Sequence, residues 1–370
     1  METLRVMTVV GTRPEIIRLS QLIKRLSLEF DHKLVHTGQN NDPQLSEVFF
    51  RDLGLQQPDL FLEIELGSPG VVVGQTLQKM EAAIDKFSPE AIMILGDTNS
   101  ALSAYVAERR GIPVYHMEAG NRSFDSNVPE ELNRRIVDHM ASFNLAYNSY
   151  SKANLVREGI DPRRIFVTGS PLREVLAVSR DGIGESSALQ DMGLEPGEFF
   201  LVSLHRQENV DSPDRLSTCI GTLQRMGELW GKRIVMSVHP RTQKAFANLE
   251  ISLDGIELCR PFGFFDYMKL QVSAFCVISD SGTISEESAM LGFPAISMRS
   301  SIERPEAIDV GSTVLAGVDS RSVSQAIKLA TLAFKPTMPE GYEVDDFSER
   351  VVRILSSTVH AHTEWLGLRK

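Results

Sequence analysis

Apolar and polar positions alternate along the chain with two periods. Short, nearly continuous apolar runs predict buried strands, and the segments between them carry apolar residues at intervals of three and four, which is typical of helices. In the first half, the predicted strands are Leu4–Val10, Lys33–His36, Ala91–Leu95, Val114–Met117, Phe143–Tyr147 and Ile165–Thr168. This order of strand and helix predicts a mostly parallel, buried sheet.

Two of the predicted helices carry their apolar residues on one face. One begins near Pro14 and carries a core-facing stripe of Ile16, Leu19, Ile23 and Leu26. In the helix that begins at Pro129, we expect the buried stripe to consist of Leu132, Ile136 and Met140. Glu130 and Arg134, four residues apart, would then share a different face of this helix.

The strand and helix pattern restarts after residues 179–198. Its strands are Phe199–Leu204, Arg233–Val238, Ile256–Leu258, Phe275–Ile278, Ala295–Met298 and Thr313–Ala316. We therefore expect a first domain at residues 1–184, a second at 185–345, and a C-terminal helix and tail at 346–370. The tail contains Trp365 and Leu366, so it should dock; the sequence leaves the place open, with the first domain as one option.

Composition narrows the classes of function. The 370 residues are 42% hydrophobic, enough for two cores, and the net charge of -11 argues against a nucleic-acid partner. The sequence has no apolar run of about 20 residues and no signal peptide, so we expect a cytoplasmic protein that does not enter a membrane. The three cysteines lack metal-type spacing, and HExxH, Walker and GxGxxG motifs are absent, so neither a metal nor a cofactor is expected.

In the first domain, candidate site residues follow the predicted strands, where open α/β sheets bind ligands. Arg13 and Arg18 could grip phosphate oxygens, although a solvated arginine pair is an alternative. Asp97 and Glu118 end neighbouring strands and could exchange protons; Asp97 could instead cap the next helix. Glu130 with Arg134 could equally be a pair that only stabilises its helix.

The second domain offers two further candidates. His205 leaves an apolar strand and could bind a diphosphate or exchange a proton, or it could be structural. The turn Ser281-Gly282-Thr283 feeds a helix N-terminus, which suits phosphate, but an ordinary capped turn explains the same residues.

Together these motifs resemble the non-hydrolysing UDP-N-acetylglucosamine 2-epimerase family. The similarity runs from Gly11 to about Glu306 and rests on an ordered set of short motifs. These are Gly11-Thr12-Arg13-Pro14-Glu15, His36-Thr37-Gly38-Gln39, Gly96-Asp97-Thr98, His116-Met117-Glu118-Ala119-Gly120, Pro129-Glu130-Glu131-Leu132-Asn133-Arg134, His205-Arg206-Gln207-Glu208-Asn209, His239-Pro240, Ser279-Asp280-Ser281-Gly282 and Glu303-Arg304-Pro305-Glu306.

The resemblance implies two Rossmann-like, doubly wound domains in the arrangement of B-type glycosyltransferases, and a homodimer. It also implies inversion at C2 of a UDP-2-acetamido sugar, by elimination of UDP to a 2-acetamidoglycal and re-addition. Asp97, Glu118 and Glu130 would be the acid/base carboxylates, with His205 also in the catalytic set. The residues implied to bind substrate are Arg13, Arg18, Arg134, His205, Ser281, Gly282, Thr283, Glu287 for the ribose, and Arg304.

Departures from the glucosamine pattern point to a branch of the family. Arg18 stands where Lys is usual, Asn121 where Leu is usual, and Ser170-Pro171 follows Gly169 where Asn is usual; Thr283 and Ser285 also differ from the pattern. These variants resemble the enzymes that convert UDP-2-acetamido-2,6-dideoxy-L-talose to UDP-N-acetyl-L-fucosamine for capsule and O-antigen lipopolysaccharide. Formation of UDP-N-acetylmannosamine from UDP-N-acetylglucosamine is the alternative within the family. A glycosyltransferase of the same fold and a nucleotide-sugar sensor are the alternatives outside it.

Overall fold

The computed structural model describes residues 3–38, 49–65, 67–238, 240–247, 252–332 and 337–365. The chain forms two compact units: unit 1 comprises Met1–Val178 with Glu340–Lys370, and unit 2 comprises Ser179–Pro339. Both borders lie a few residues before the expected ones at 184/185 and 345/346. The C-terminal segment, whose docking place the sequence left open, is therefore part of unit 1.

Unit 1 is built on a parallel sheet with the strand order β3-β2-β1-β4-β5-β6-β7. Every strand predicted for the first half overlaps one of its strands, whereas the two-residue edge strand β3 was not predicted. The strands are β1 (Arg5–Val10), β2 (Asp31–His36), β3 (Leu60–Phe61), β4 (Ala91–Leu95), β5 (Val114–Met117), β6 (Phe143–Ala146) and β7 (Ile165–Val167). All of β4 and β5 is buried, as expected of strands covered on both faces.

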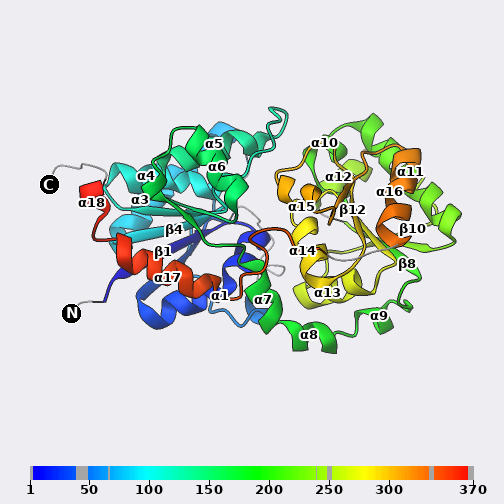
Figure 1. Cartoon of the computed structure of the whole chain (residues 1–370), viewed down its shortest axis with the longest axis horizontal. Helices are drawn as coiled ribbons and strands as arrows, with labels where there is room; N and C mark the ends of the chain where they lie inside the picture. Colours follow the sequence, from blue (N-terminus) through cyan, green and yellow to red (C-terminus); the bar gives the residue numbers. More distant parts are fainter. Residues whose placement is uncertain are drawn as a thin grey trace. The chain divides into compact units, whose positions relative to one another are not determined.

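The helices of unit 1 connect these strands. They are α1 (Arg13–Glu29), α3 (Pro69–Phe87), α4 (Ala104–Arg109), α5 (Pro129–Met140), α6 (Ser149–Arg157), α7 (Leu172–Val178), α17 (Phe347–Thr358) and α18 (His362–Trp365), with short 3-10 helices η1 (Asn99–Ser103) and η2 (Pro162–Arg164). The predicted stripe of α1 is buried, with Ile16, Leu19 and Leu26 fully inaccessible. Figure 1 shows α17 alongside α1, far from it in sequence. Near the C-terminus, Trp365 packs edge-on against Phe143 of β6, with 6.1 Å between ring centroids.

Unit 2 repeats the architecture with the strand order β10-β9-β8-β11-β12-β13. Every strand pair is parallel, and each strand predicted for the second half overlaps one of these. The strands are β8 (Phe199–Ser203), β9 (Arg233–Ser237), β10 (Ile256–Cys259), β11 (Cys276–Ser279), β12 (Ala295–Ser297) and β13 (Val314–Leu315). The fold class expected from the sequence, two doubly wound α/β domains, is confirmed.

The helices of unit 2 begin before its first strand. They are α8 (Arg180–Glu185), α9 (Ala188–Asp191), α10 (Gln207–Val210), α11 (Pro213–Trp230), α12 (Pro240–Ala247), α13 (Phe264–Ser273), α14 (Ile284–Leu291), α15 (Pro305–Asp309) and α16 (Ser320–Leu332). Helix α8 packs against α13. Gly182 of α8 lies so close to the Phe265 ring of α13 that a Cβ atom on residue 182 would be 2.8 Å from the ring. This packing explains why unit 2 begins at Ser179 rather than at residue 185.

Each sheet has one point at which the strand order reverses direction, β1/β4 in unit 1 and β8/β11 in unit 2. In open parallel sheets, ligands bind beyond the carboxyl ends of the strands at such a point. The motifs that begin at Gly11 and Gly96 lie there in unit 1, and those that begin at His205 and Ser279 lie there in unit 2.

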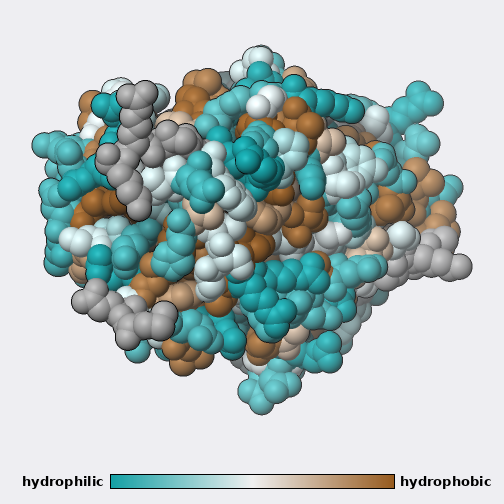
Figure 2. Space-filling view, turned by 60° about the vertical axis from the view of Figure 1, so that its left-hand side comes forward, coloured by the Kyte–Doolittle hydropathy of each residue, from teal (hydrophilic) through white to brown (hydrophobic). Residues whose placement is uncertain are grey.

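The surface is mixed in polarity. On the face drawn in Figure 2, hydrophilic side chains surround smaller hydrophobic areas. Within the described ranges, no helix is long and apolar enough to cross a membrane.

Candidate active site

Asp97 and Glu118 follow neighbouring strands of unit 1, as the sequence predicts. Leu95 at the end of β4 is in register with Met117 at the end of β5, and the Gly96 amide donates to the Met117 carbonyl at 3.0 Å. Both carboxylates therefore leave the sheet at the same edge. Their side chains are 22% and 15% exposed, so both are reachable from solvent yet largely enclosed.

Glu118 has an unusual backbone. Its φ is +64°, in the left-handed region, although it carries a side chain. For an L-residue this conformation costs roughly 1–2 kcal/mol, and such residues cluster at functional sites. Its carboxylate accepts hydrogen bonds from Arg18, from Asn121 (3.2 Å) and from the Tyr147 hydroxyl (3.2 Å).

Arg18 is not exposed to solvent, so the alternative of a solvated arginine pair does not hold for it. Its side chain is 4% exposed and forms an ion pair with Glu118. The guanidinium carbon lies 5.9 Å from the centroid of the Tyr147 ring, within the range of a cation–π contact. Arg13 lies at the first turn of the same helix, with its guanidinium carbon 5.6 Å from the Phe49 ring centroid.

The predicted orientation of α5 is wrong. Leu132 and Ile136, expected in the core, are 64% and 38% exposed, and Met140 is only partly buried. The buried side chains of this helix are Glu131, Arg134, Val137 and Asp138. Charged residues can occupy this inner face because each of them finds an oppositely charged partner there.

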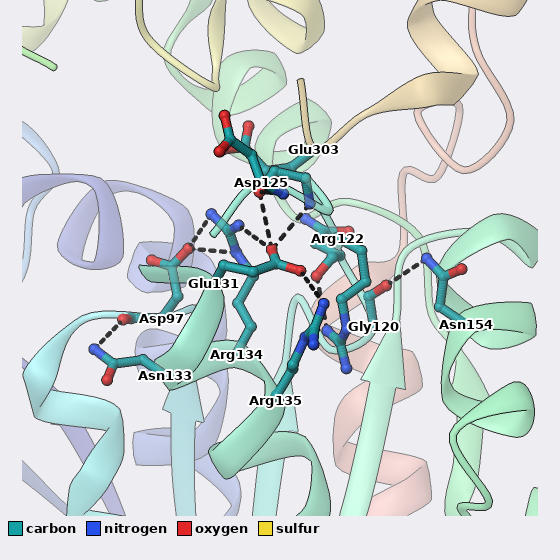
Figure 3. Close-up of polar contacts among 12 residues, drawn as sticks. Asp97, Gly120, Arg122, Asp125, Glu131, Asn133, Arg134, Arg135, Asn154 and Glu303 are labelled. Carbon is teal, nitrogen blue, oxygen red and sulfur yellow. Dashed lines mark hydrogen bonds and ion pairs between the residues drawn. The ribbon is translucent and has the colours of Figure 1, made fainter. Parts of the chain in front are cut away.

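Arg134 lies between two carboxylates, as Figure 3 shows. Its Nε donates to Oδ2 of Asp97 at 2.8 Å, and its Nη1 donates to Oε2 of Glu131 at 3.0 Å. Arg134 thus fixes Asp97 in place. Because Asp97 and Glu131 account for the position of the Arg134 side chain, no pair with Glu130 is needed to explain that position. Glu130 itself occupies the first turn of α5 and is half-buried.

Glu131 was not singled out from the sequence, although it is more buried than Glu130. Its Oε2 accepts from the Ser123 amide at 2.9 Å and from the Ser123 hydroxyl at 3.0 Å, and Arg135 donates to Oε1. Burial alone would raise the pKa of Glu131, but the hydrogen bonds from Ser123 and Arg134 outweigh it and lower the pKa. Glu131 is therefore an ionised anchor for Arg134 rather than a proton donor.

A second buried charge cluster underlies the turn that carries Glu118. Asp138, fully inaccessible, lies 2.7 Å from Arg122 and 2.9 Å from Nδ1 of His116, and it accepts from the Gly120 amide at 3.1 Å. Nε2 of His116 lies 2.8 Å from the Gly96 carbonyl oxygen. The cluster joins the turns that follow β4 and β5.

Glu15, the last residue of the Gly11–Glu15 motif, fixes the turn after β1. Its Oε2 accepts from the amides of Gly11 (2.5 Å) and Thr12 (3.3 Å), and its Oε1 accepts from the hydroxyl of Thr98, the neighbour of Asp97. Burial raises the pKa of Glu15 to about 7, although these hydrogen bonds act to lower it. The side chain ties the β1 turn to the β4 turn.

The raised pKa predicts a pH dependence of stability. Between its ordinary value of 4.5 and about 7, the folded chain keeps a proton on Glu15 that the unfolded chain has lost. This group's contribution to the free energy of unfolding therefore falls as pH rises through that window. Glu15→Gln mimics the protonated form, so we expect urea unfolding to show a weaker decline between about pH 5 and about pH 7 than in the parent. Identical pH slopes in parent and variant would contradict this.

In unit 2, His205 follows β8 and is held by Asp280, which follows β11. The fully buried Asp280 accepts from the backbone amides of His205 (3.0 Å) and Arg206 (3.0 Å) and from the side chain of Asn209 (3.1 Å). Nδ1 of His205 is 3.3 Å from the same carboxylate. The imidazole is 37% exposed, so it keeps a surface for ligand contact.

The turn Ser281-Gly282-Thr283 leads into α14, with Thr283 as its N-cap residue. The Ser281 hydroxyl accepts from the Thr283 amide at 3.3 Å and lies 3.0 Å from the Thr283 hydroxyl. Because the Thr283 side chain forms no capping hydrogen bond, the turn differs from the ordinary capped turn of the alternative interpretation. It also presents the positive end of a helix dipole, which favours phosphate.

Arg304 and Glu287 are both fixed by polar partners in unit 2. Arg304 is buried, donates to the Gly282 carbonyl at 3.1 Å and lies 3.0 Å from Glu286. Glu287 accepts from the Gln271 side chain at 2.6 Å. Arg304 thus connects the Glu303–Glu306 motif to the turn Ser281-Gly282-Thr283. The motif residues Gln39 and His239 lie outside the described residues.

Comparisons with known proteins agree on one family. The family model for UDP-N-acetylglucosamine 2-epimerase matches residues 23–356. The structure of UDP-N-acetylglucosamine 2-epimerase from Rickettsia bellii has 37% sequence identity and a TM-score of 0.90, covering 100% of both chains. That of the Methanocaldococcus jannaschii enzyme in complex with UDP-GlcNAc and UDP has 32% identity and a TM-score of 0.90, covering 96% of this chain and 100% of that chain.

A relative with a different substrate is also similar. The UDP-2,3-diacetamido-2,3-dideoxy-D-glucuronate 2-epimerase of Pseudomonas aeruginosa is 31% identical over 318 residues, covering 85% of this chain and 88% of its own. Proteins named for different UDP-sugars are therefore about equally similar to this chain, with 32% and 31% sequence identity.

Proposed function

Since the chain belongs to the UDP-N-acetylglucosamine 2-epimerase family and is a UDP-sugar 2-epimerase, we propose that its substrate is UDP-2-acetamido-2,6-dideoxy-L-talose. The product is then UDP-N-acetyl-L-fucosamine, a precursor for capsule or O-antigen. UDP-N-acetylglucosamine is the second candidate substrate, favoured by the names of the relatives.

One observation carries the choice of branch. Arg18 and Asn121, two of the departures from the glucosamine pattern, both contact the carboxylate of Glu118. They are far apart in sequence and come from different elements, α1 and the turn after β5. Changes that converge on one candidate catalytic group support an altered substrate more than changes scattered over the surface would.

The reaction proposed is elimination and re-addition. A carboxylate removes the C2 proton, the C–H electron pair forms the C1–C2 double bond, and the C1–O bond breaks with its electrons passing to UDP. UDP then adds back to C1 while C2 is reprotonated on the opposite face. Asp97, Glu118 and Glu130 are the candidates for the two proton transfers.

Unit 2 supplies the proposed UDP site. The diphosphate contacts His205, the Ser281-Gly282-Thr283 turn and Arg304, and Glu287 binds the ribose hydroxyls. In unit 1, Arg13 is a proposed substrate-binding residue, and Arg134 positions the substrate through its place beside Asp97. The structural relative from M. jannaschii was solved in complex with UDP-GlcNAc and UDP, which supports a UDP-sugar as the ligand.

Exchange of the C2 proton tests the reaction and the substrate together. We expect the enzyme, incubated in D₂O with UDP-2-acetamido-2,6-dideoxy-L-talose, to form the epimer with deuterium at C2, without added NAD or divalent metal. NMR of the C2 position measures both events. An epimer that keeps its C2 proton would contradict the elimination route. Turnover of UDP-N-acetylglucosamine alone would replace the proposed branch by the second candidate, and sugar transfer without exchange would indicate a glycosyltransferase.

A cytoplasmic homodimer completes the proposal. Leu132 and Ile136 of α5 expose apolar surface that a second subunit could cover.

A further inference from the structure

Two side chains that sequence reasoning gave no catalytic role contact Glu118. The Asn121 amide donates to Oε1 at 3.2 Å, and the Tyr147 hydroxyl donates to Oε2 at 3.2 Å. Asn121 is 4% exposed and Tyr147 is fully buried, so neither is a surface residue that happens to lie nearby. Arg18 adds its charge on the same oxygen as Tyr147.

Both donors are themselves held in place. The side-chain oxygen Oδ1 of Asn121 accepts from the Ser151 hydroxyl of α6 at 2.9 Å. This bond directs the side-chain nitrogen Nδ2 toward Glu118. The Tyr147 ring is fully buried and lies 5.9 Å from the guanidinium carbon of Arg18, and the backbone of Tyr147 lies close against Gly341. The Asn121 amide therefore cannot turn away from Glu118 without losing the bond from Ser151, and the Tyr147 ring is enclosed by the protein on all sides.

The two donors act on opposite oxygens of one carboxylate. Rotation about the last side-chain bond of Glu118 would break both hydrogen bonds, so the plane of the carboxylate is fixed. A proton-transferring group must be held to within about 0.5 Å and 10–20° of its productive geometry by such supporting contacts. The left-handed backbone of Glu118 restrains the same group from the other end.

We propose that Asn121 and Tyr147 are positioning residues that orient the Glu118 carboxylate for transfer of the C2 proton. This inference rests on the proposed function, in which Glu118 is one of the acid/base groups. Arg18 supplies the charge that keeps the carboxylate in place, and Asn121 and Tyr147 supply its direction.

Asn121→Leu and Tyr147→Phe test the proposal because each removes a donor and keeps most of the side-chain volume. We expect exchange at C2 in D₂O to slow by about tenfold or more in each variant, because a displaced group can lose about 10²-fold in rate. The affinity for UDP, measured by calorimetry, should stay within about twofold of the parent. With C2-deuterated substrate, the isotope effect on turnover should increase, since proton transfer becomes slower relative to other steps.

Asn154→Leu is the matched control. Its side chain donates to the Gly120 carbonyl at 3.0 Å, so it supports the same turn without contacting the carboxylate. We expect turnover and isotope effect close to those of the parent. Ser151→Ala removes the hydrogen bond to Oδ1 of Asn121. It should slow exchange at C2 less than Asn121→Leu does.

The outcomes separate the two proposals. No exchange in the parent would overturn the proposed function itself. Exchange in the parent, with parental rates and isotope effects in Asn121→Leu and Tyr147→Phe, would overturn the positioning role alone. An equal loss in Asn154→Leu would also overturn it, because general loosening of the turn would then suffice. If Asn121→Leu does not fold, Tyr147→Phe decides the question.

Discussion

Glu118→Gln is expected to lower turnover by about 10²-fold or more while changing UDP affinity little. The amide keeps the shape of the side chain but cannot accept a proton, and general acid–base catalysis contributes about 10²–10⁴-fold. The ion pair with the buried Arg18 is also lost, so a lower melting temperature should accompany the loss of activity. Steady-state kinetics, UDP calorimetry and thermal melting measure the three effects.

His205→Ala is the comparison for this variant. His205 belongs to unit 2 and is the proposed diphosphate ligand, so its removal should weaken UDP binding, whereas Glu118→Gln should spare it. Near-parental turnover in a folded Glu118→Gln enzyme would assign Glu118 a structural role, as the partner of Arg18.

Asp138→Ala is expected to destabilise unit 1 by about 3–5 kcal/mol, the usual effect of removing one partner from a buried ion pair. The change leaves Arg122, which is 2% exposed, without one of its anionic partners, and the Gly120 amide loses its acceptor. Urea unfolding followed by circular dichroism measures the difference in the free energy of unfolding.

Asp346→Ala is the matched control because Asp346 forms an ion pair of the same length and its side chain caps no helix. It lies 2.7 Å from Arg350, as Asp138 does from Arg122, but both side chains are exposed. Solvent-exposed pairs contribute little, so we expect no resolvable change in unfolding midpoint. Equal effects of the two substitutions would show that burial does not set the strength of the Asp138 contacts.

The sheets could be predicted because their strands are buried on both faces. Such strands appear in the sequence as continuous apolar runs, and the residue after each run then lies at the ligand edge of the sheet. Asp97, Glu118 and His205 were located by this reasoning alone. Strand β3, by contrast, has two residues and a partly exposed edge position, so it has no run to detect.

Helix α5 was misread because periodicity records apolarity and not burial. Its inner face includes Arg134 and Asp138, which are paired with Asp97 and Arg122, residues that are distant in sequence. Those pairings are tertiary, so no local pattern reveals them. The exposed Leu132 and Ile136 then imitate a core stripe.

The supporting residues of the site were missed for a related reason. Tyr147 ends an apolar strand and looks like a core residue in sequence, which it is, apart from the hydroxyl that reaches Glu118. Asn121 was noticed only as a departure from a pattern. Its role depends on the orientation of one amide, set by Ser151, and this orientation is visible only in the structure.

The return of the C-terminal segment to unit 1 has a consequence for synthesis of the chain on the ribosome. Phe347, Val351 and Leu355 of α17 are fully buried in unit 1, whose residues Met1–Val178 are made first. Unit 2 is a continuous segment and is complete by Pro339. Domains usually fold from the N-terminus as they emerge. Here the first domain to emerge is the last that can finish, and the surface of α1 that α17 covers stays exposed until α17 has been translated.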